Sequence, residues 1–559
     1  MSLELPKHLE KYIVKQDYRK YTPQDQAVWR YCLRQLKHFM KDNGHPCYAE
    51  GLTKTGISVE YIPKIAEMSE CLEKFGWTAL PVSGFIPPAA FMELQSLGVL
   101  PIACDMRNID HLLYTPAPDI VHEAAGHAPI IVDEEYANYL KQYSQVAKKA
   151  IISKEDINLY EAIRDLSDIK ENPSSTVNDI VKAENRLSET AKGMTHVSEA
   201  AQLSRMNWWT AEYGLIGDIK NPKIFGAGLL SSIGESKWCL SEKVKKIPLT
   251  VDCVEQTYDI TEPQPQLFVT PDFKTLVTVL EQFSETMAYK TGGKEGLFKA
   301  LAAQSVNTVE LDSGLQISGV LESYLTIDFE SDEVIFMKFS GPTQLSTKDK
   351  QLEGHGPEYH KEGFSMPLGE FFYNSLKLNT EVEFRYASGF KVSGILTKTT
   401  PVNRSSVIYT FDKATMTYEN QIFFKPEWGS LDIAVGLEIT SVYGGPADRE
   451  KFGQTDDFVA ATVPSGGASM DQIKLFYLYQ KIRDLRTQGD ITESAVLGLY
   501  HECKDLAPQE WLLFVELLEL AIQFKLTLAT EIEAHLNSVM KEADILNQVI
   551  SDGIKLAHA

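Results

Sequence analysis

The chain of 559 residues is long enough for about two to four compact units, at a prior of roughly 150 residues per domain. Hydrophobic residues make up 43% of it and charged residues 23%, with 35 Gly and 25 Pro, which excludes collagen-like, low-complexity and wholly disordered proteins. The 77 acidic and 54 basic residues give a net charge of −23, and this charge argues against nucleic acid or an anionic membrane as a partner.

Cysteine usage and the N-terminal sequence predict a location. The seven cysteines form no CxxC pair and are odd in number, as is typical of reduced thiols. The N-terminal residues contain no apolar segment of signal-peptide length, and no apolar run of about 18 residues occurs in the chain. We therefore expect a cytoplasmic protein.

The first 300 residues have a mainly helical pattern. Apolar residues recur at helical spacing within 1–76, and a short apolar run at Val99–Ala103 predicts a strand. After the prolines of YTPAPD, Asp119 is placed to cap a helix that begins at Ile120, and after a break a second helix is expected to about residue 150. A second, polar-faced helical stretch follows over about 159–203, with an interruption at Asn172-Pro173.

The pattern changes near residue 300. Short runs of alternating apolar and polar residues between 306 and 442 predict a β-rich domain, a barrel or a sandwich. Two of its segments, SGLQISGVLESY and SGFKVSGILTKT, resemble each other. Helical periodicity returns after a loop, so the expected division is 1–300 mainly α, 301–465 β-rich and 466–559 a helical bundle or arm.

The segment DIVHEAAGH places three candidate metal ligands close together: His122, Glu123 and His127. The zinc-protease motif HExxH differs, since its histidines lie on one helical face, whereas residues five apart lie about 140° from each other at 3.6 residues per turn. Gly126 and Pro129 predict an unwound helix end in which Ala128 leaves the helical region and His127 turns toward His122.

A third candidate ligand lies in NWWTAEYGL, where Glu212 stands among aromatic residues. A buried carboxylate must be paired, protonated or bound to a metal. Two imidazoles and one carboxylate are the ligands of non-haem Fe(II) oxygenases, which keep the remaining positions for O₂ and co-substrate. By itself, Glu212 would be interpreted as a core carboxylate held in an ion pair.

Several motifs in fixed order resemble the catalytic domain of the pterin-dependent aromatic amino acid hydroxylases. They are YTPAPDIVHEAAGHAPI, WWTAEYGL, IFGAGLLSSIGE, CLSEK and IPL. The resemblance is weak from about residue 20, strong over 80–135 and 204–270, and fades before residue 300. It is closest to bacterial members that act on phenylalanine. It implies a mainly α catalytic domain of this family before the β-rich and C-terminal helical parts, and that His122, His127 and Glu212 hold one Fe(II).

The resemblance also implies how the chain binds its pterin and substrate. The tetrahydropterin would lie against the loop with Gly84, Phe85 and Ile86, stack on Phe91 and meet Glu123. Arg107 would bind the carboxylate of a free amino acid, with Trp208 beside its ring and Thr115, Gly228, Ser231 and Glu235 around its backbone. Val269 stands where phenylalanine-specific members carry an apolar residue. The implied reaction is ring hydroxylation of L-phenylalanine to L-tyrosine by a monooxygenase that uses Fe(II), a tetrahydropterin and O₂.

The chain departs from the family pattern at several points. The stretch between His127 and Glu212 is longer than usual, with the excess around 150–200. Asn207 stands where the family places a tyrosine near the iron, and Pro88 replaces a serine of the pterin loop. Alternative functions are therefore hydroxylation of tryptophan or another aromatic compound, a zinc hydrolase built on HEAAGH, and a non-catalytic amino-acid-binding scaffold.

Two features of the C-terminal half lie outside the resemblance. In EGHGPEYHKEG, His355 and His360 are again five apart, but the Gly-rich, charged composition predicts an exposed, mobile loop and no metal site. An apolar face in the C-terminal helices predicts core packing, or alternatively the interface of a homo-oligomer. Its residues are Trp511, Leu513, Phe514, Leu517 and Leu520.

Overall fold

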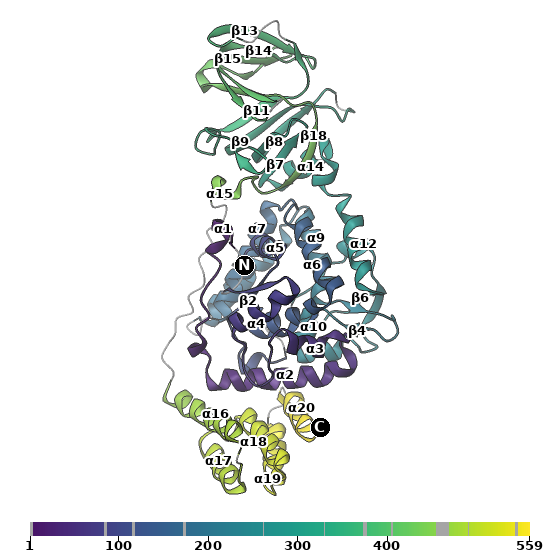
Figure 1. Cartoon of the computed structure of the whole chain (residues 1–559), viewed down its shortest axis with the longest axis vertical. Coiled ribbons are helices and arrows are strands. Elements are labelled where there is room, and N and C mark those ends of the chain that lie inside the picture. Colours follow the sequence, from purple (N-terminus) through teal and green to yellow (C-terminus); the bar gives the residue numbers. More distant parts are fainter. Residues whose placement is uncertain are drawn as a thin grey trace.

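The computed structural model describes residues 4–82, 86–113, 118–171, 175–260, 262–328, 330–372, 377–403, 406–453, 469–489, 491–542 and 546–559. A mainly helical region lies in the middle of the molecule, with the β-rich region at one end and the C-terminal helices at the other (Figure 1). None of the described helices has the length and apolar character needed to span a bilayer.

The helical region is built around the long helix α2 (Pro23–Asn43). Thr22 and Asp25 form a capping box at its start, and Pro23 occupies the first turn, where its missing N–H costs nothing. The other helices of this region are α1 (Lys7–Glu10), α3 (Cys47–Lys54), α4 (Ile65–Leu72), α5 (Pro88–Ser96), α6 (Glu134–Ala147), α7 (Lys154–Glu171), α8 (Val177–Lys192), α9 (Glu199–Asn207), α10 (Ala227–Ser231), α11 (Ile233–Trp238) and α12 (Phe273–Ser284).

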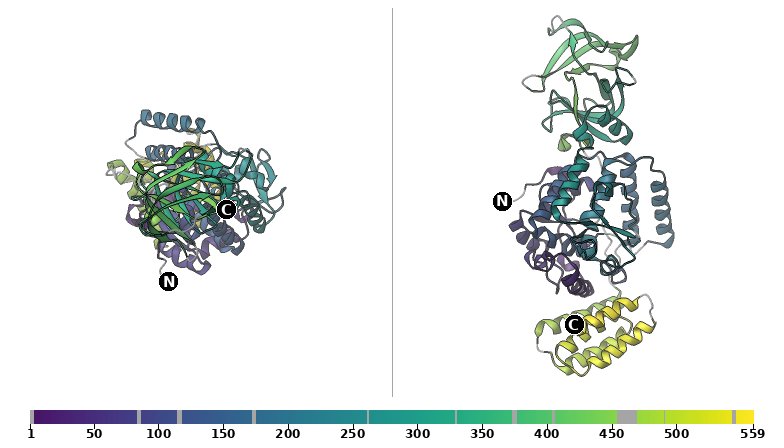
Figure 2. Two further views of the ribbon diagram at one scale, coloured as in Figure 1. Left: turned by 90° about the horizontal axis from the view of Figure 1, so that it is seen from above. Right: turned by 90° about the vertical axis from the view of Figure 1, so that its right-hand side faces the viewer.

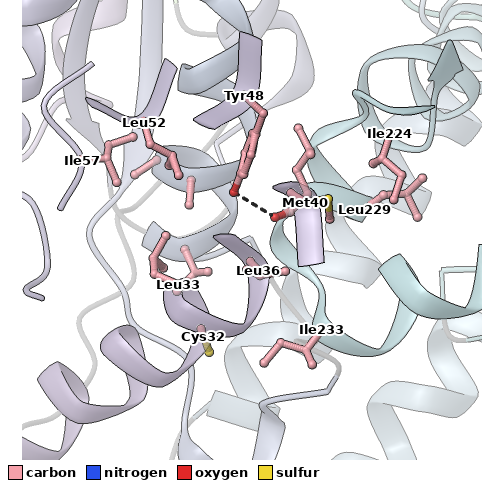
Figure 3. Packing of buried hydrophobic residues seen from close by; sticks show 14 of the residues in the cluster. Cys32, Leu33, Leu36, Met40, Tyr48, Leu52, Ile57, Ile224, Leu229 and Ile233 are labelled. Atoms are coloured by element: carbon pink, nitrogen blue, oxygen red, sulfur yellow. Dashed lines mark hydrogen bonds between the residues drawn. The ribbon is translucent and has the colours of Figure 1, made fainter. Parts of the chain in front are cut away.

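The buried face of α2 fixes the position of α10. Leu33, Leu36 and Met40 of α2 pack with Leu52 of α3 and Leu229 of α10 in one core (Figure 3). Within this core the Tyr48 hydroxyl donates to the Leu230 carbonyl over 3.5 Å. This packing holds α10, which carries two of the predicted site residues, against the longest helix of the region.

Two small sheets complete this region. The predicted strand over 99–103 is confirmed as β2 (Val99–Ala103), which pairs in parallel with β1 (Thr78–Val82). The second sheet has the order β4-β3-β6-β5. Its strands are β3 (Leu215–Ile216), β4 (Lys223–Ile224), β5 (Lys245–Pro248) and β6 (Gln266–Thr270), and Val269 of β6 pairs with Leu215 of β3.

The long stretch between His127 and Glu212 contains a pair of neighbouring helices. Helices α7 and α8 pack against each other at the edge of the helical region (Figure 2). Thr176 and Asp179 form a capping box at the start of α8, and Arg186 of α8 pairs with Asp165 of α7. The predicted interruption at Asn172-Pro173 lies outside the described residues.

The β-rich region consists of two antiparallel sheets of six strands. The first has the order β10-β9-β8-β7-β18, with β11 also paired to β9; the second has the order β12-β13-β14-β15-β16, with β17 also paired to β15. The pairing among the described residues closes neither sheet into a barrel. The bounds are β7 (Val306–Leu311), β8 (Gln316–Thr326), β9 (Val334–Thr347), β10 (Lys350–Gln351), β11 (Gly363–Pro367), β12 (Phe371–Phe372), β13 (Thr380–Tyr386), β14 (Lys391–Pro401), β15 (Val407–Tyr418), β16 (Gln421–Phe424), β17 (Leu431–Ala434) and β18 (Ile439–Gly444).

The two segments that resemble each other in sequence occupy equivalent strands. One forms β8 and the other forms β14, and each is the middle strand of an antiparallel meander, β7-β8-β9 or β13-β14-β15. The similarity therefore reflects the same local topology in both sheets.

Specific contacts join the β-rich region to the helical region. α13 (Ala288–Thr291) and α14 (Gly293–Ala303) lead into it, and α15 (Arg449–Phe452) follows β18. Arg449 pairs with Glu93 of α5 at 2.8 Å, and the Lys149 ammonium lies 3.6 Å from the centre of the Tyr443 ring. Lys149 also accepts a backbone hydrogen bond from Gly444.

The C-terminal helices pack against α2 of the same chain. They are α16 (Met470–Gln488), α17 (Glu493–Leu506), α18 (Trp511–Gln523), α19 (Ala529–Glu542) and α20 (Asn547–His558). Arg30 of α2 pairs with Glu516 and Glu519 of α18, and the Tyr31 ring meets the Trp511 ring edge-on at 5.2 Å. The predicted apolar face of α18 is buried within the chain, so core packing is confirmed and the interface alternative for this face is wrong.

The prediction of an exposed loop around His355 and His360 is wrong. His355 is 1% exposed and His360 7%. The reason is backbone pairing: the Leu345 N–H of β9 donates to the His355 carbonyl, and the Thr343 N–H of β9 donates to the His360 carbonyl. The loop between β10 and β11 is thus held against the first sheet despite its polar composition.

Candidate active site

The helix that carries both histidines of HEAAGH is wider than an α-helix. Val121–His127 forms a π-helix, whose hydrogen bonds link residues five apart, so that His122 and His127 share a face. Their Nε2 atoms lie 3.2 Å apart and their rings meet edge-on. The convergence predicted from the spacing is present, but a wider helical turn produces it.

The predicted unwound end after Gly126 is therefore wrong. Ala128 keeps helical dihedral angles, φ −60° and ψ −40°, and a 3₁₀ turn over Ala128–Val132 follows directly. Packing outweighs the bias that Pro129 imposes on Ala128: a Cβ on Gly126 would lie 2.6 Å from the Ala227 carbonyl oxygen. Gly126 thus lets α10 lie against the π-helix and hold its backbone in place.

Glu212 is the last residue of a second π-helix, Trp208–Glu212. Its Oε2 lies 3.3 Å from His122 Nε2, and its Oε1 lies 3.3 Å from His127 Nε2. The structure therefore brings the three predicted metal ligands together. Such separations suit donor atoms that share one ion at bond lengths of about 2.1 Å. Two imidazoles and one carboxylate fit Fe(II) with its remaining coordination positions open.

The two carboxylates at the histidines differ in ionisation. Burial acts to raise the pKa of Glu212, but the adjacent His127 and His122 outweigh burial and hold that pKa well below its ordinary value. For Glu123 burial dominates and raises the pKa to about 8. Glu123 Oε2 lies 4.0 Å from His127 Nε2 and has no hydrogen-bond partner. Glu212 is therefore the closer and more acidic of the two candidate ligands, and burial favours the protonated form of Glu123.

A buried network orients His122. Its Nδ1 lies 3.1 Å from the Ser231 hydroxyl, and Ser231 also accepts a hydrogen bond at its carbonyl from Arg107 over 3.1 Å. The backbone N–H of His122 donates to Asp119 Oδ1 over 3.0 Å, which confirms that Asp119 caps this helix. A hydrogen bond to the second nitrogen of a ligating imidazole fixes the ring and its tautomer.

Arg107, the predicted carboxylate-binding residue, is 5% exposed and already paired. Its Nε and Nη2 donate to the two oxygens of Asp119, each over 2.8 Å. Together with the bond to Ser231, these contacts use three of the five guanidinium N–H groups. Asp119 therefore fixes the direction in which the remaining N–H groups point.

Aromatic rings line the side of the site that carries Trp208. This ring stacks between Tyr213, at 4.4 Å, and Tyr258, at 4.2 Å. A Cβ on Gly228 would lie 2.9 Å from the Tyr213 ring, so this glycine permits the close approach of α10. Burial raises the pKa of Glu235 on α11 to about 7, against the lowering effect of its hydrogen bond with Tyr213.

The structure places the remaining predicted residues as follows. Gly84, Phe85 and Thr115 lie outside the described residues. Ile86 is buried and Phe91 half-buried in a small apolar cluster between β1, β2 and α5, separate from the core around the histidines. Val269 is buried near the C-terminal end of β6, beside the strand that follows Glu212.

Several residues at the site were not predicted from sequence. Asn207 was placed near the iron by the sequence, but its contact with Glu212 was not predicted: Nδ2 lies 3.5 Å from Oε1, at the limit of a hydrogen bond. Asp119 was expected only as a helix cap. Its pairing with Arg107 was not predicted, because the spacing of the two residues along the chain does not indicate it. Tyr258 stands in a loop without periodicity, and only the structure reveals its stacking on Trp208.

Comparison with known proteins identifies the helical region. The family model of the biopterin-dependent aromatic amino acid hydroxylases matches residues 11–159 and 190–296. The unmatched interval falls on α7 and α8, in agreement with the predicted insertion.

Individual relatives match the same part of the chain. Phenylalanine-4-hydroxylase of Mesorhizobium japonicum is 28% identical over 270 residues, which cover 47% of this chain and 81% of the relative. The Bos taurus enzyme of that name is 29% identical over 276 residues, and the chain spans only 51% of its length. A solved Chromobacterium violaceum phenylalanine hydroxylase with bound iron(III) and 7,8-dihydrobiopterin is 20% identical, covers 51% of this chain and 92% of its own, and has a TM-score of 0.39. Through residues 11–159 and 190–296, the chain belongs to the biopterin-dependent aromatic amino acid hydroxylase family.

Proposed function

We propose that the chain is a pterin-dependent non-haem iron monooxygenase that converts L-phenylalanine to L-tyrosine with Fe(II), a tetrahydropterin and O₂. The convergence of His122, His127 and Glu212 within the matched region carries this proposal. When bound, the iron and the reduced pterin together supply the activation of O₂ for ring hydroxylation. The side chains of the protein supply binding, orientation and charge.

Neighbouring residues hold the metal ligands in the ionisation state and orientation that a cation requires. Glu212 is ionised at neutral pH because its pKa is held low, so it offers a full negative charge. Ser231 holds His122 through Nδ1 and leaves Nε2 facing His127 and Glu212. The Asn207 side-chain amide Nδ2 lies 3.5 Å from Glu212 Oε1 and helps to orient the carboxylate.

The site offers a binding partner to each charged group of a free amino acid, the carboxylate and the ammonium. The guanidinium of Arg107, aimed by Asp119, is suited to the substrate carboxylate, because two N–H groups can meet two oxygens. Glu235 offers a carboxylate to the ammonium group. The faces of the Trp208 ring are covered by Tyr213 and Tyr258, so its edge is the part that can meet the substrate ring. Val269 supports phenylalanine as the substrate, since an apolar ring needs no polar partner at this position.

The pterin would occupy the side of the site that carries Glu123. Protonated Glu123 can donate a hydrogen bond from its carboxylic acid, and its Oε2 has no protein partner. A buried polar atom without a partner is costly unless a ligand satisfies it. Glu123 is therefore suited to a polar edge of the heteroaromatic ring.

The proposal is tested by reconstitution. Purified protein is loaded anaerobically with Fe(II) and given L-phenylalanine, tetrahydrobiopterin and O₂, and tyrosine is measured by chromatography. We expect tyrosine only when pterin is present, and none from His122→Ala, whereas the exposed His38→Ala retains activity. Stoichiometric iron with turnover of tryptophan instead would change the substrate, and absence of iron binding would overturn the proposal.

A further inference from the structure

The second His-x₄-His pair of the chain forms a buried cluster with one carboxylate. His355 Nδ1 and His360 Nε2 lie 3.1 Å apart. Asp432 Oδ2 lies 3.9 Å from His355 Nδ1 and 4.0 Å from His360 Nε2. The side chains of all three residues are at most 6% exposed. None of the three falls within the residues that the family model matches.

The three donor atoms form a triangle of the right size for a metal ion. The point equidistant from them lies about 2.1 Å from each, which is the bond length of zinc to histidine nitrogen and carboxylate oxygen. A small movement of any one side chain would change this value little. An ion at that point would contact two imidazoles and one carboxylate oxygen at once.

The backbone holds both histidines in this arrangement. They lie in the loop between β10 and β11, and the carbonyls of His355 and His360 accept hydrogen bonds from Leu345 and Thr343 of β9. Asp432 lies on β17, which pairs with β15 of the second sheet. The cluster therefore brings together side chains from both sheets.

A second layer of hydrogen bonds orients the donor atoms inward. The Thr400 hydroxyl lies 3.3 Å from His355 Nε2, so the other ring nitrogen, Nδ1, faces the cluster. The Thr410 hydroxyl donates to Asp432 Oδ1 over 2.6 Å, so Oδ2 faces the histidines. Outer hydrogen bonds of this kind are regular features of protein metal sites, where they fix the orientation of the ligands.

A bound cation would balance the charge of the buried carboxylate in this cluster. The carboxylate of Asp432 is 3% exposed and faces two imidazole rings that are 2% and 6% exposed. Lys398, whose positive charge reaches Asp432, is itself exposed. Neutral imidazoles are the form that binds metals, and a divalent ion would compensate the buried carboxylate.

We infer that His355, His360 and Asp432 form a zinc site that fastens the two sheets of the β-rich region to each other. Zinc fits because it accepts imidazole and carboxylate ligands, and because a sealed site that joins two sheets needs no redox chemistry. The three protein ligands leave the fourth tetrahedral position of zinc to a water molecule, and the site is separate from the proposed iron site. It does not depend on the proposed hydroxylation.

Metal content of full-length variants tests the inference. The variant His122→Ala/His127→Ala removes the first histidine pair, so zinc bound to it must lie elsewhere. After chelator dialysis, exposure to Zn²⁺ and gel filtration, we expect one zinc per chain by mass spectrometry of metals. Adding His360→Gln should reduce zinc more than tenfold, whereas adding His38→Gln, at an exposed position of α2, should leave it unchanged.

Asp432→Asn provides the second variant in the same background. It keeps the size of the side chain and an oxygen for Thr410, so it serves even where His360→Gln fails to fold. We expect it to lose zinc and to lose the rise in Tm that zinc causes in its parent. A parent that binds no zinc, or zinc retained at one per chain in Asp432→Asn, would overturn the inference.

Discussion

The two His-x₄-His pairs of this chain converge by different means. His122 and His127 meet because a π-helix places residues five apart on one face. His355 and His360 meet because hydrogen bonds to β9 fold an irregular loop back onto a sheet. In each case a distant carboxylate, Glu212 or Asp432, completes the cluster. Equal spacing thus has no fixed structural meaning, and the surrounding backbone decides what it produces.

Accessibility separates the two clusters. The side chains of His122 and Glu212 are each 16% exposed, whereas those of His355 and Asp432 are 2% and 3% exposed. A catalytic ion must be reached by substrate and O₂, and a structural ion must be protected from exchange. The first cluster is open enough for chemistry, and the second is sealed.

The largest expected effect comes from removing a ligand of the open cluster. Glu212→Gln replaces the ionised carboxylate by a neutral amide of the same shape, so we expect loss of iron binding and activity at background level. Iron content and tyrosine formation are the measurements, and Glu242→Gln, at an exposed position, is the control. Full activity of Glu212→Gln would show that another residue completes the metal site.

A smaller effect is expected from the residue that orients His122. Ser231→Ala removes the hydroxyl at Nδ1 and should weaken iron binding by about 10–100-fold, as is usual for such outer partners. Anaerobic iron titration measures this change, with Ser494→Ala as the control. An unchanged iron affinity would mean that the π-helix alone holds His122 in place.

Zinc should stabilise the sealed cluster without affecting the chemistry of the open one. At about 100 times its Kd, a bound ligand stabilises the folded state by about 2.7 kcal/mol. We expect Zn²⁺ to raise the Tm of His122→Ala/His127→Ala by several degrees, as measured by calorimetry. Equal shifts in this variant and in its Asp432→Asn derivative would contradict the difference drawn between the clusters.

The smallest effect is a pH dependence at the open cluster. Because the pKa of Glu235 is about 7, this acid is mostly protonated at pH 6 and ionised at pH 8. The ionised form attracts the substrate ammonium, so the KM for the amino acid should fall several-fold between these pH values. Glu235→Gln should raise the KM and remove this pH dependence, and a KM profile identical to that of the unmodified protein would exclude this role.

Motif order in the sequence was sufficient to predict the open cluster. HEAAGH and WWTAEYGL contain all three candidate ligands, and the insertion, the strand over 99–103 and the β-rich pattern after residue 300 were also predicted. These features depend on local periodicity or on motifs that lie close together in the chain.

The features that were not predicted depend on contacts between distant segments. Ala128 stays helical because α10 packs against Gly126, and His355 is buried because β9 pairs with its loop. The pairing of Arg107 with Asp119 joins residues that lie 12 apart in the chain. Composition indicates how polar a segment is, but it cannot show which neighbours will cover it.

The most direct test of the central claim is to trace an oxygen atom from O₂ into the product. The iron-loaded protein is incubated with L-phenylalanine and tetrahydrobiopterin under ¹⁸O₂, and the product is analysed by mass spectrometry. A monooxygenase at the His122–His127–Glu212 site predicts tyrosine that carries one ¹⁸O atom, formed in step with pterin oxidation and absent with Glu212→Gln. Unlabelled tyrosine, or pterin oxidation without any hydroxylated amino acid, would contradict the account.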